Sequence, residues 1–191
     1  MRKAIAVLIM LGVCSIYFLA MESQDVADVV DTVAIQEELK ADMNERIERI
    51  IEQIEAEYPA TPKLLIEVSN EIMEVQYSEA WEPDNELEKQ TLLALRLLCS
   101  NRLLELNTYN KQIENLRTEL IKNHTEGVYL NNSKIESINF LTPDDAFVEV
   151  IYDTTKGTQK REYTLVKEEG LWKIYSWKDL GPVSEDQVVE E

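Results

Sequence analysis

The hydrophobic positions of this chain follow three different spacings. Residues 4–20 are an unbroken run of uncharged side chains that follows Arg2 and Lys3. From residue 24 to about residue 122, apolar side chains recur mostly at steps of three and four, which is typical of amphipathic helices. After Gly127 apolar and polar positions alternate, which is typical of strands. The pattern predicts an α+β fold, with a membrane segment and helices preceding a β-meander.

The uncharged run predicts a transmembrane anchor over residues 4–20. At ~1.5 Å per residue the run spans about 25 Å as a helix, the short limit for crossing a bilayer. A cleaved signal peptide needs small residues at positions −3 and −1, but a cut after Ala20 would place Phe18 at −3. An uncleaved anchor is therefore the preferred interpretation, and cleavage stays the alternative.

The charges beside this run predict its orientation. Basic residues precede it and an acidic excess follows it, and basic flanks are retained in the cytoplasm. Residues 1–3 are then a cytoplasmic tail, and the domain beyond the anchor is extracytoplasmic. The prediction is a single-pass protein of the plasma membrane.

A long acidic helix is predicted at residues 24–57. Residues 21–60 hold 12 acidic and 3 basic side chains, a net of −9, which is half of the chain's formal charge of −18. Such a helix could lay its apolar stripe on its own domain or pair two copies as a coiled-coil stalk, giving a homo-oligomer. Docking on its own domain is preferred because the spacing is not a sustained heptad.

The next segment, residues 58–182, predicts a helical part and then a meander. Thr61 and Pro62 suit the N-cap and first position of a helix whose buried stripe includes Leu64, Leu65 and Ile72. A leucine-rich third helix runs from Leu87 to Leu106, and a more polar one covers 107–122. Strands are predicted at 135–141, 147–152, 162–167 and 171–177. Residues 183–191 form an acidic tail that is predicted to be disordered.

In the last strand, alternation places Trp172 and Ile174 in the core. The same alternation puts Lys173, Tyr175 and Trp177 on the opposite face, with Lys173 in water.

Composition excludes several classes of protein. Acidic residues outnumber basic ones, 37 to 19, which argues against a nucleic-acid partner because phosphate neutralisation supplies most of that affinity. Two cysteines and one histidine rule out zinc-finger sites and disulfide scaffolds. Cys99 is flanked by leucines and is expected to be a buried thiol rather than a nucleophile. No metal site, cofactor or catalytic group is predicted.

The order of helices followed by a meander that closes with Gly170-Leu171-Trp172-Lys173-Ile174-Tyr175-Ser176-Trp177 resembles the cone-shaped fold of nuclear-transport-factor-two-like proteins. Together with Tyr58-Pro59-Ala60-Thr61-Pro62, the leucine-rich helix and the anchor, it is also similar to a bacterial family of uncharacterised membrane-anchored extracytoplasmic proteins. The resemblance covers residues 58–178. It implies helices that plug the concave face of a curved sheet.

Enzymes of that superfamily place carboxylate and hydroxyl groups inside the cone, and the residues here show no such constellation. Tyr152, Asp153 and Tyr163 are the candidates for lining a cavity, should the cone be open. Asp144 and Asp145 lie on a predicted turn, where aspartate is favoured for backbone bonding.

The sequence therefore favours a non-catalytic binding or interaction module. Its partner would be an extracytoplasmic protein or a wall component. The alternatives are a scaffold subunit of a secretion or conjugation-type envelope complex, and a small-ligand binder or enzyme that uses the cone cavity.

Overall fold

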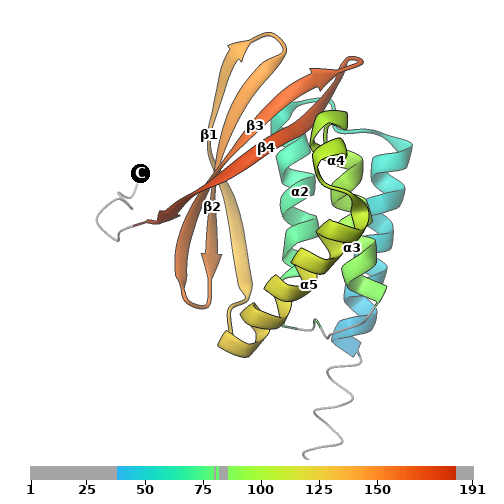
Figure 1. The fold of residues 1–191 in the computed structure, drawn as a ribbon, viewed down its shortest axis with the longest axis vertical. Coiled ribbons are helices and arrows are strands. Elements are labelled where there is room, and N and C mark those ends of the chain that lie inside the picture. Colours follow the sequence, from blue (N-terminus) through green and yellow to red (C-terminus); the bar gives the residue numbers. More distant parts are fainter. Residues whose placement is uncertain (1–37, 80, 82–85, 184–191) are drawn as a thin grey trace, which may run out of the picture. The chain divides into compact units, whose positions relative to one another are not determined.

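The computed structural model describes residues 38–79, 81 and 86–183. A helix runs through residues 38–56, followed by α2 (Pro62–Gln76), α3 (Glu86–Leu98), α4 (Asn101–Leu106) and α5 (Tyr109–Glu126). The strands β1 (Leu130–Thr142), β2 (Asp145–Thr154), β3 (Gly157–Glu168) and β4 (Leu171–Pro182) form one sheet in the order β1-β2-β3-β4, with every neighbouring pair antiparallel (Figure 1). The predicted α+β class and the meander are confirmed.

The chain divides into two compact units, residues 1–41 and 42–191. The predicted tail 1–3, the anchor 4–20 and the first part of the helix 24–57 lie outside the described residues, as does the tail beyond residue 183. Within the described ranges, no helix is both long and apolar enough to cross a membrane.

Local capping sets the helix boundaries that the sequence predicted. Thr61 has extended backbone angles, and its hydroxyl accepts a hydrogen bond from the Leu64 amide at 3.2 Å, with Pro62 at the first helical position. At the other end of the helical part, Gly127 caps α5 with a φ of 65°, a left-handed conformation that glycine adopts without a Cβ penalty.

The leucine-rich helix is two helices, so the prediction of one continuous element was wrong. The break falls at Cys99 and Ser100, where the chain pairs with β4 instead: the Ser100 amide donates to the Ile174 carbonyl at 2.9 Å. Ser100 then caps α4, because its side chain accepts from the Leu103 amide. The chain can leave the helix here because the Ser100 amide finds a partner on β4 in place of a helical carbonyl.

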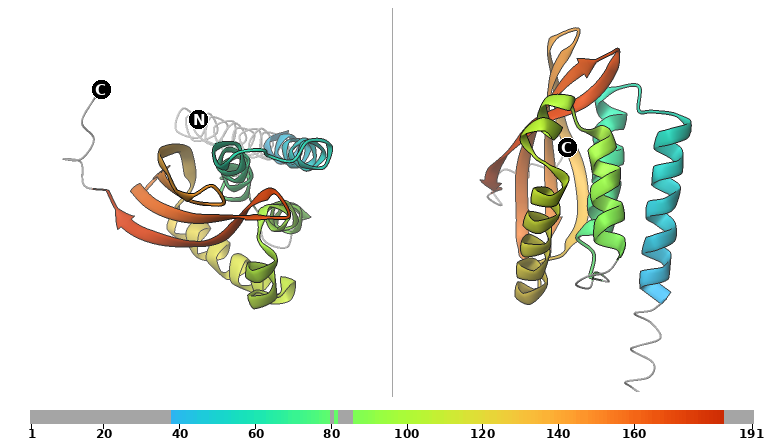
Figure 2. Two further views of the ribbon diagram at one scale, coloured as in Figure 1. Left: turned by 90° about the horizontal axis from the view of Figure 1, so that it is seen from above. Right: turned by 45° about the vertical axis from the view of Figure 1, so that its right-hand side comes forward.

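The main core lies between one face of the sheet and the helices. Residues 42–56 contribute Ile47, Ile50 and Ile54 to it, so this part of the acidic helix docks on its own domain as preferred. The helices lie on one face of the sheet (Figure 2). The sheet contributes a row of buried side chains along three strands, namely Ala146, Val148, Val150, Tyr152, Tyr163, Leu165, Trp172 and Ile174.

Not every leucine of the predicted stripes is buried. Leu64 on α2 is 46% exposed, whereas the next two residues, Leu65 and Ile66, are fully buried. On α3, Leu93 and Leu97 are 50% and 40% exposed. These two leucines of the leucine-rich segment therefore lie at the surface within the described part of the chain.

A register shift in β4 changes which way Trp177 faces. Leu165 pairs with Ile174, and Tyr163 pairs with Trp177, so Tyr175 is an extra residue between the two pairs. Because directly paired residues share a face, this bulge brings Trp177 to the side of Tyr163 and Ile174. The prediction from strict alternation, which put Trp177 opposite Ile174, was wrong.

Lys173 also departs from the prediction that it lies in water. Its ammonium nitrogen donates to the Leu97 carbonyl at 2.8 Å and lies 4.2 Å from the centroid of the Tyr58 ring. The burial of this half-exposed lysine lowers its pKa from the ordinary value.

Candidate functional site: a two-lobed cleft between the sheet and α5

The orientation of α5 leaves a cleft beside the sheet. Leu116 and Leu120 of α5 are buried in a second, smaller core with Trp81 and Leu92, apart from the main core. With its apolar stripe committed there, α5 directs polar side chains at the sheet, among them Glu119, Asn123 and Glu126. The space between them stays open because closing it would desolvate carboxylate and amide groups.

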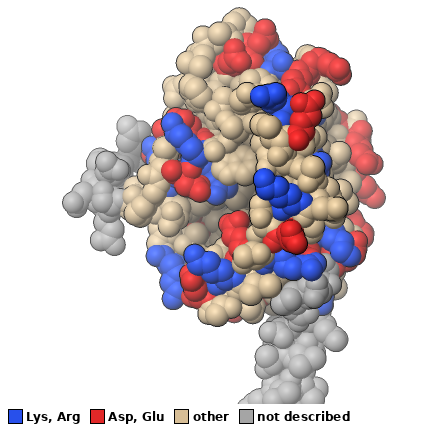
Figure 3. All heavy atoms as spheres, viewed as in Figure 1, with Lys and Arg blue, Asp and Glu red and all other residues tan. Residues whose placement is uncertain are grey.

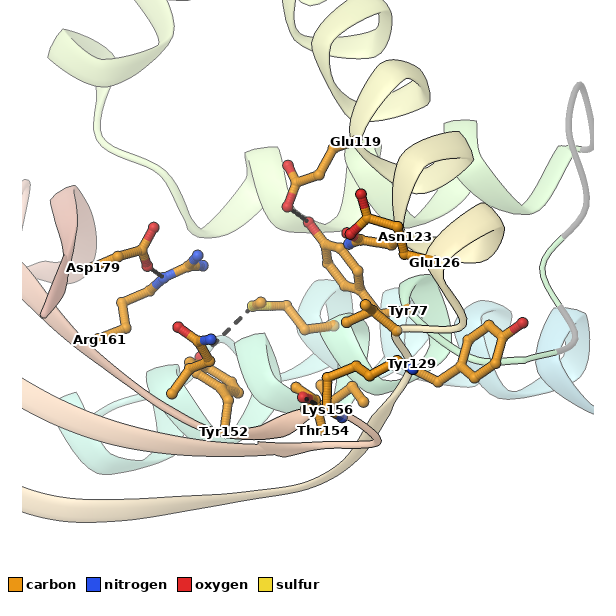
Figure 4. Close-up of a pocket in the computed structure, with 14 residues that line it drawn as sticks. Tyr77, Glu119, Asn123, Glu126, Tyr129, Tyr152, Thr154, Lys156, Arg161 and Asp179 are labelled. Atoms are coloured by element: carbon orange, nitrogen blue, oxygen red, sulfur yellow. Dashed lines mark hydrogen bonds and ion pairs between the residues drawn. The ribbon is translucent and has the colours of Figure 1, made fainter. Parts of the chain in front are cut away.

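The larger cavity, the polar lobe, has a volume of about 490 Å³. The polar ends of the sheet form its floor, and α5 forms its opposite wall (Figure 4). Most of its lining side chains carry a hydroxyl, amide or charged group. The lining residues are Met73, Tyr77, Glu119, Asn123, Glu126, Val128, Tyr129, Leu130, Tyr152, Thr154, Lys156, Gln159, Arg161 and Asp179.

The second cavity, the apolar lobe, has a volume of about 350 Å³ and is lined in part by α3 and α4. Its lining combines leucines with amide side chains. Its lining includes Leu95, Arg96, Cys99, Gln112, Leu116 and Trp177. The two lobes share Met73, Tyr77, Glu119 and Arg161, so they adjoin and form one cleft.

The gradient from apolar to polar follows the strands. On β3 the residues of the cleft face are Leu165, Tyr163, Arg161 and Gln159 in turn, so the row passes from aliphatic to charged and amide groups. The two-residue period of a strand keeps all four on one face. The same row of the sheet therefore builds the core at one end and the cleft at the other.

Charged and hydroxyl groups in the cleft are held by specific partners. The Arg161 guanidinium donates to the Asp179 carboxylate at 2.6 Å and lies 5.6 Å from the centroid of the Tyr152 ring. The Tyr77 hydroxyl donates to the Glu119 carboxylate at 3.0 Å, joining the end of α2 to α5. On the face seen in Figure 3, acidic and basic side chains are interspersed rather than separated.

Burial raises the pKa of two tyrosines and of the cysteine that line the cleft. It is the main cause that raises the pKa of Tyr77 and of Tyr152, and the carboxylate of Glu119 raises the pKa of Tyr77 further. Burial also raises the pKa of the Cys99 thiol to about 11, although Arg96 and Lys173 act in the opposite direction. These groups stay protonated at neutral pH, whereas a nucleophile or base needs a pKa near the working pH.

Several polar side chains of the polar lobe have no partner in the part of the chain that the structure describes. Among the described residues, the side chains of Asn123, Glu126 and Gln159 make no hydrogen bond or ion pair, and all three line the polar lobe. An amide side chain offers both donors and an acceptor. The lobe therefore presents unused hydrogen-bonding groups to whatever occupies it.

Over the described ranges, no cluster of three or more histidine, cysteine or acidic side chains is arranged to hold a metal ion.

The three sequence-predicted lining residues have different positions. Tyr152 lines the polar lobe and Tyr163 lines the apolar lobe, and their hydroxyl oxygens lie 2.7 Å apart. Asp153 is exposed and lines neither lobe, because it follows Tyr152 on the strand and so faces the opposite side. Asp144 lies on the β1–β2 turn and forms an ion pair with Lys167.

Sequence reasoning missed the residues that join the two lobes. Glu119 and Tyr77 come from different helices, and no local pattern shows that they meet. Arg161 had a usable signal, because it stands two residues before Tyr163 on a predicted strand and must share its face.

The fold and cleft define an α+β domain with helices on one face of an antiparallel meander and an open, mixed-polarity binding cleft. The chain belongs to the family described as "Domain of unknown function (DUF6715)", whose model matches residues 1–177. No curated protein matches it. A solved structure that matches is "Crystal structure of intermembrane space region of chloroplast protein ARC6", at 14% identity and a TM-score of 0.38, covering 64% of this chain and 96% of that chain.

Proposed function

We propose that this chain is a non-catalytic binding module, held at the outer face of the plasma membrane by residues 4–20, whose ligand occupies the cleft. Its domain is then a variant of the nuclear-transport-factor-two-like cone, with the helices only partly filling the concave face of the sheet. The partner is an extracytoplasmic protein or a wall component.

The observation that carries this proposal is the polar face that α5 turns toward the sheet. Three side chains there and on β3, Asn123, Glu126 and Gln159, have unused hydrogen-bonding groups within the described structure. A helix whose purpose is only to cover a sheet would present an apolar stripe. An open cleft with a few convergent polar groups is the usual form of a binding site.

The non-catalytic part of the proposal rests on the titration of the cleft. The pKa values of Tyr77, Tyr152 and Cys99 are all raised, mainly by burial, so none of these groups is a thiolate or phenolate at neutral pH. The cleft's arginine, Arg161, is already paired with Asp179. Such an arrangement can orient and hold a ligand.

The anchoring part of the proposal rests on the sequence of residues 4–20 and on the basic residues that precede them. Adding protease to intact cells that produce the full chain tests it. The domain around Trp177 should be digested from outside while the cells remain closed. A domain protected until the cells are broken would contradict the proposed orientation.

Site-specific photocrosslinking tests the cleft. A photoreactive amino acid replaces Gln159, which lines the polar lobe, and in a matched variant it replaces Glu149 on the opposite face of the same sheet region. We expect a defined adduct from the Gln159 variant in producing cells and none of that size from the Glu149 variant. Equal adducts from both faces, or none from either, would contradict the cleft as the binding site.

A further inference from the structure

The apolar lobe contains an arginine whose charge is not matched by an acidic partner. One terminal nitrogen of Arg96 donates to the Asn107 carbonyl at 3.0 Å and to the side-chain oxygen of Gln112. The guanidinium also lies 5.9 Å from the centroid of the Tyr109 ring. All of these partners are neutral, and within the described residues Arg96 forms no ion pair. A half-buried guanidinium of this kind keeps donors for a further acceptor.

The lobe's carboxylate lies at the other end. Glu119 is the one acidic residue among the described residues that line the apolar lobe. It follows Gln112 by seven residues, about 10.5 Å along α5. It already accepts the Tyr77 hydroxyl, and the second arginine of the lobe, Arg161, is paired with Asp179. The uncompensated charge at the Arg96 end is therefore positive.

The surroundings of the Cys99 thiol are consistent with this local charge. Cys99 lines the apolar lobe, and the two charged side chains that act on its pKa, Arg96 and Lys173, are both cations. In a chain with a formal charge of −18, this is a positively charged apolar environment inside an acidic protein. Charge complementarity therefore favours an anionic group beside an apolar one.

We infer that the apolar lobe binds an apolar group that ends in a carboxylate, with the carboxylate paired to Arg96 and the apolar part between Leu95, Leu116 and Trp177. This inference rests on the proposed binding function of the cleft and names its ligand class. The chemistry is shared by two sources, a free fatty acid and the C-terminal residue of a peptide. A guanidinium recognises a carboxylate through paired, charge-assisted hydrogen bonds that a neutral amide cannot supply.

The test uses the full chain in lipid nanodiscs, labelled with 5-fluorotryptophan and observed by fluorine NMR. The chain has three tryptophans, of which Trp177 lines the lobe, whereas Trp81 and Trp172 belong to the two cores. The variant Trp177→Phe assigns the reporter signal. Because the signal is local, partition of a ligand into the bilayer does not produce it.

The probes are two matched pairs: octanoate with octanamide, and N-acetyl-leucyl-leucine with its C-terminal amide. We expect at least one acid to shift the Trp177 signal with an affinity at least tenfold above that of its amide. Removing one charged partner of such a hydrogen bond costs about 1.5–3 kcal/mol, so Arg96→Gln should weaken the binding of that acid by about tenfold or more. Arg96→Lys should keep the preference for the acid, and Arg102→Gln, on an exposed residue of α4, should change nothing.

Which acid binds identifies the source. Octanoate alone indicates a fatty acid, and the dipeptide acid alone indicates a peptide C-terminus. If both acids and amides bind equally well, the carboxylate inference is overturned while the cleft remains a binding site. If no probe shifts the signal, the inference is likewise overturned, and the crosslinking at Gln159 decides the proposed function separately. Unchanged Trp81 and Trp172 signals in Arg96→Gln show that the variant has folded.

Discussion

The hydroxyl groups of Tyr152 and Tyr163 lie 2.7 Å apart on neighbouring strands, at the point where the main core meets the cleft. Tyr152 also donates to the side-chain oxygen of Asn70 on α2 at 2.8 Å. Because a hydroxyl has one proton, the Tyr163 hydroxyl must be the donor in the pair. This chain of bonds connects β3, β2 and α2, and it satisfies polar groups that are buried together.

Replacing Tyr152 by phenylalanine should destabilise the domain. The change keeps the ring but leaves the Asn70 oxygen and the Tyr163 hydroxyl without their buried partner, which costs about 1–3 kcal/mol. Urea denaturation followed by tryptophan fluorescence measures the free energy of unfolding. The matched control is Tyr175→Phe, because Tyr175 is 40% exposed and its hydroxyl makes no bond within the described structure. Equal losses from the two changes would contradict the role of the buried pair.

The attachment of α5 to α3 should depend on the ion pair between Arg117 and Glu88. Glu88 is fully buried on α3, and its carboxylate accepts hydrogen bonds from Arg117, including one from Nε at 3.0 Å. Removing one partner of a buried pair leaves an expensive charge behind, with typical losses of 3–5 kcal/mol. Arg117 is 39% exposed, and solvent weakens the pair, so we expect Arg117→Met to lose about 2–3 kcal/mol, somewhat less than that range.

The control for this prediction is Arg102→Met on α4, an exposed position that should lose under about 0.5 kcal/mol. The double variant Glu88→Leu with Arg117→Met should recover part of the loss, because it removes the buried charge together with its partner. A double variant less stable than the sum of the single changes would contradict this account.

The capped ends of α2 and α5 were predictable from sequence because they depend on neighbouring residues. The start of α2 at Thr61 and Pro62 and the end of α5 at Gly127 are both set within four residues of the chain. The break of the leucine-rich helix at Ser100 was not, because it depends on a bond from its amide to Ile174, 74 residues later. Local propensity for helix continues through that point, and tertiary pairing overrides it.

The cleft was predictable only in part, for a similar reason. Strand alternation identified Tyr152 and Tyr163, and the same argument would have added Arg161. Trp177 reaches the cleft only because of the bulge at Tyr175. The alternation of apolar and polar residues does not predict where a strand contains one extra residue. The cleft itself exists because Leu116 and Leu120 of α5 pack on the second core rather than on the main core. The residues that build these two cores are far apart in the sequence, so no local pattern shows which core α5 contacts.

The thiol of Cys99 should react slowly while the domain is folded. Burial raises its pKa to about 11, against about 8.5 for a free thiol, so the thiolate fraction at pH 8 falls by about two orders of magnitude. Iodoacetamide labelling of the Cys14→Ser variant, in which Cys99 is the remaining cysteine, measures this with and without urea. Labelling at the same rate in both states would contradict the buried environment.

The same shift predicts how stability depends on pH. The folded state favours the protonated thiol, so its contribution is complete below about pH 8.5 and is lost as the pH rises toward 11. Cys99→Ala should therefore show a smaller decline in the free energy of unfolding between about pH 8.5 and 10 than the parent chain. Identical declines would show that the thiol does not titrate differently in the two states.

The end of the first helix is joined to the edge strand β4 by two contacts at Tyr58. Its hydroxyl donates to the Trp172 carbonyl at 2.9 Å, and its ring lies under the Lys173 ammonium at 4.2 Å. Loss of the hydroxyl in Tyr58→Phe should cost about 1 kcal/mol, whereas the ring contact to Lys173 should survive that change. Tyr58→Leu should lose both.

A double-mutant cycle separates the ring contact from the rest. Lys173→Met combined with Tyr58→Leu should give a coupling free energy of about 0.5–1 kcal/mol in urea denaturation, the size expected for a cation at an aromatic face. For Lys173→Met combined with Tyr58→Phe, the losses in the free energy of unfolding should add. The Tyr58 hydroxyl, which this second change removes, bonds to Trp172 and not to Lys173. A coupling near zero in the first cycle would show that the ammonium is held by the Leu97 carbonyl alone.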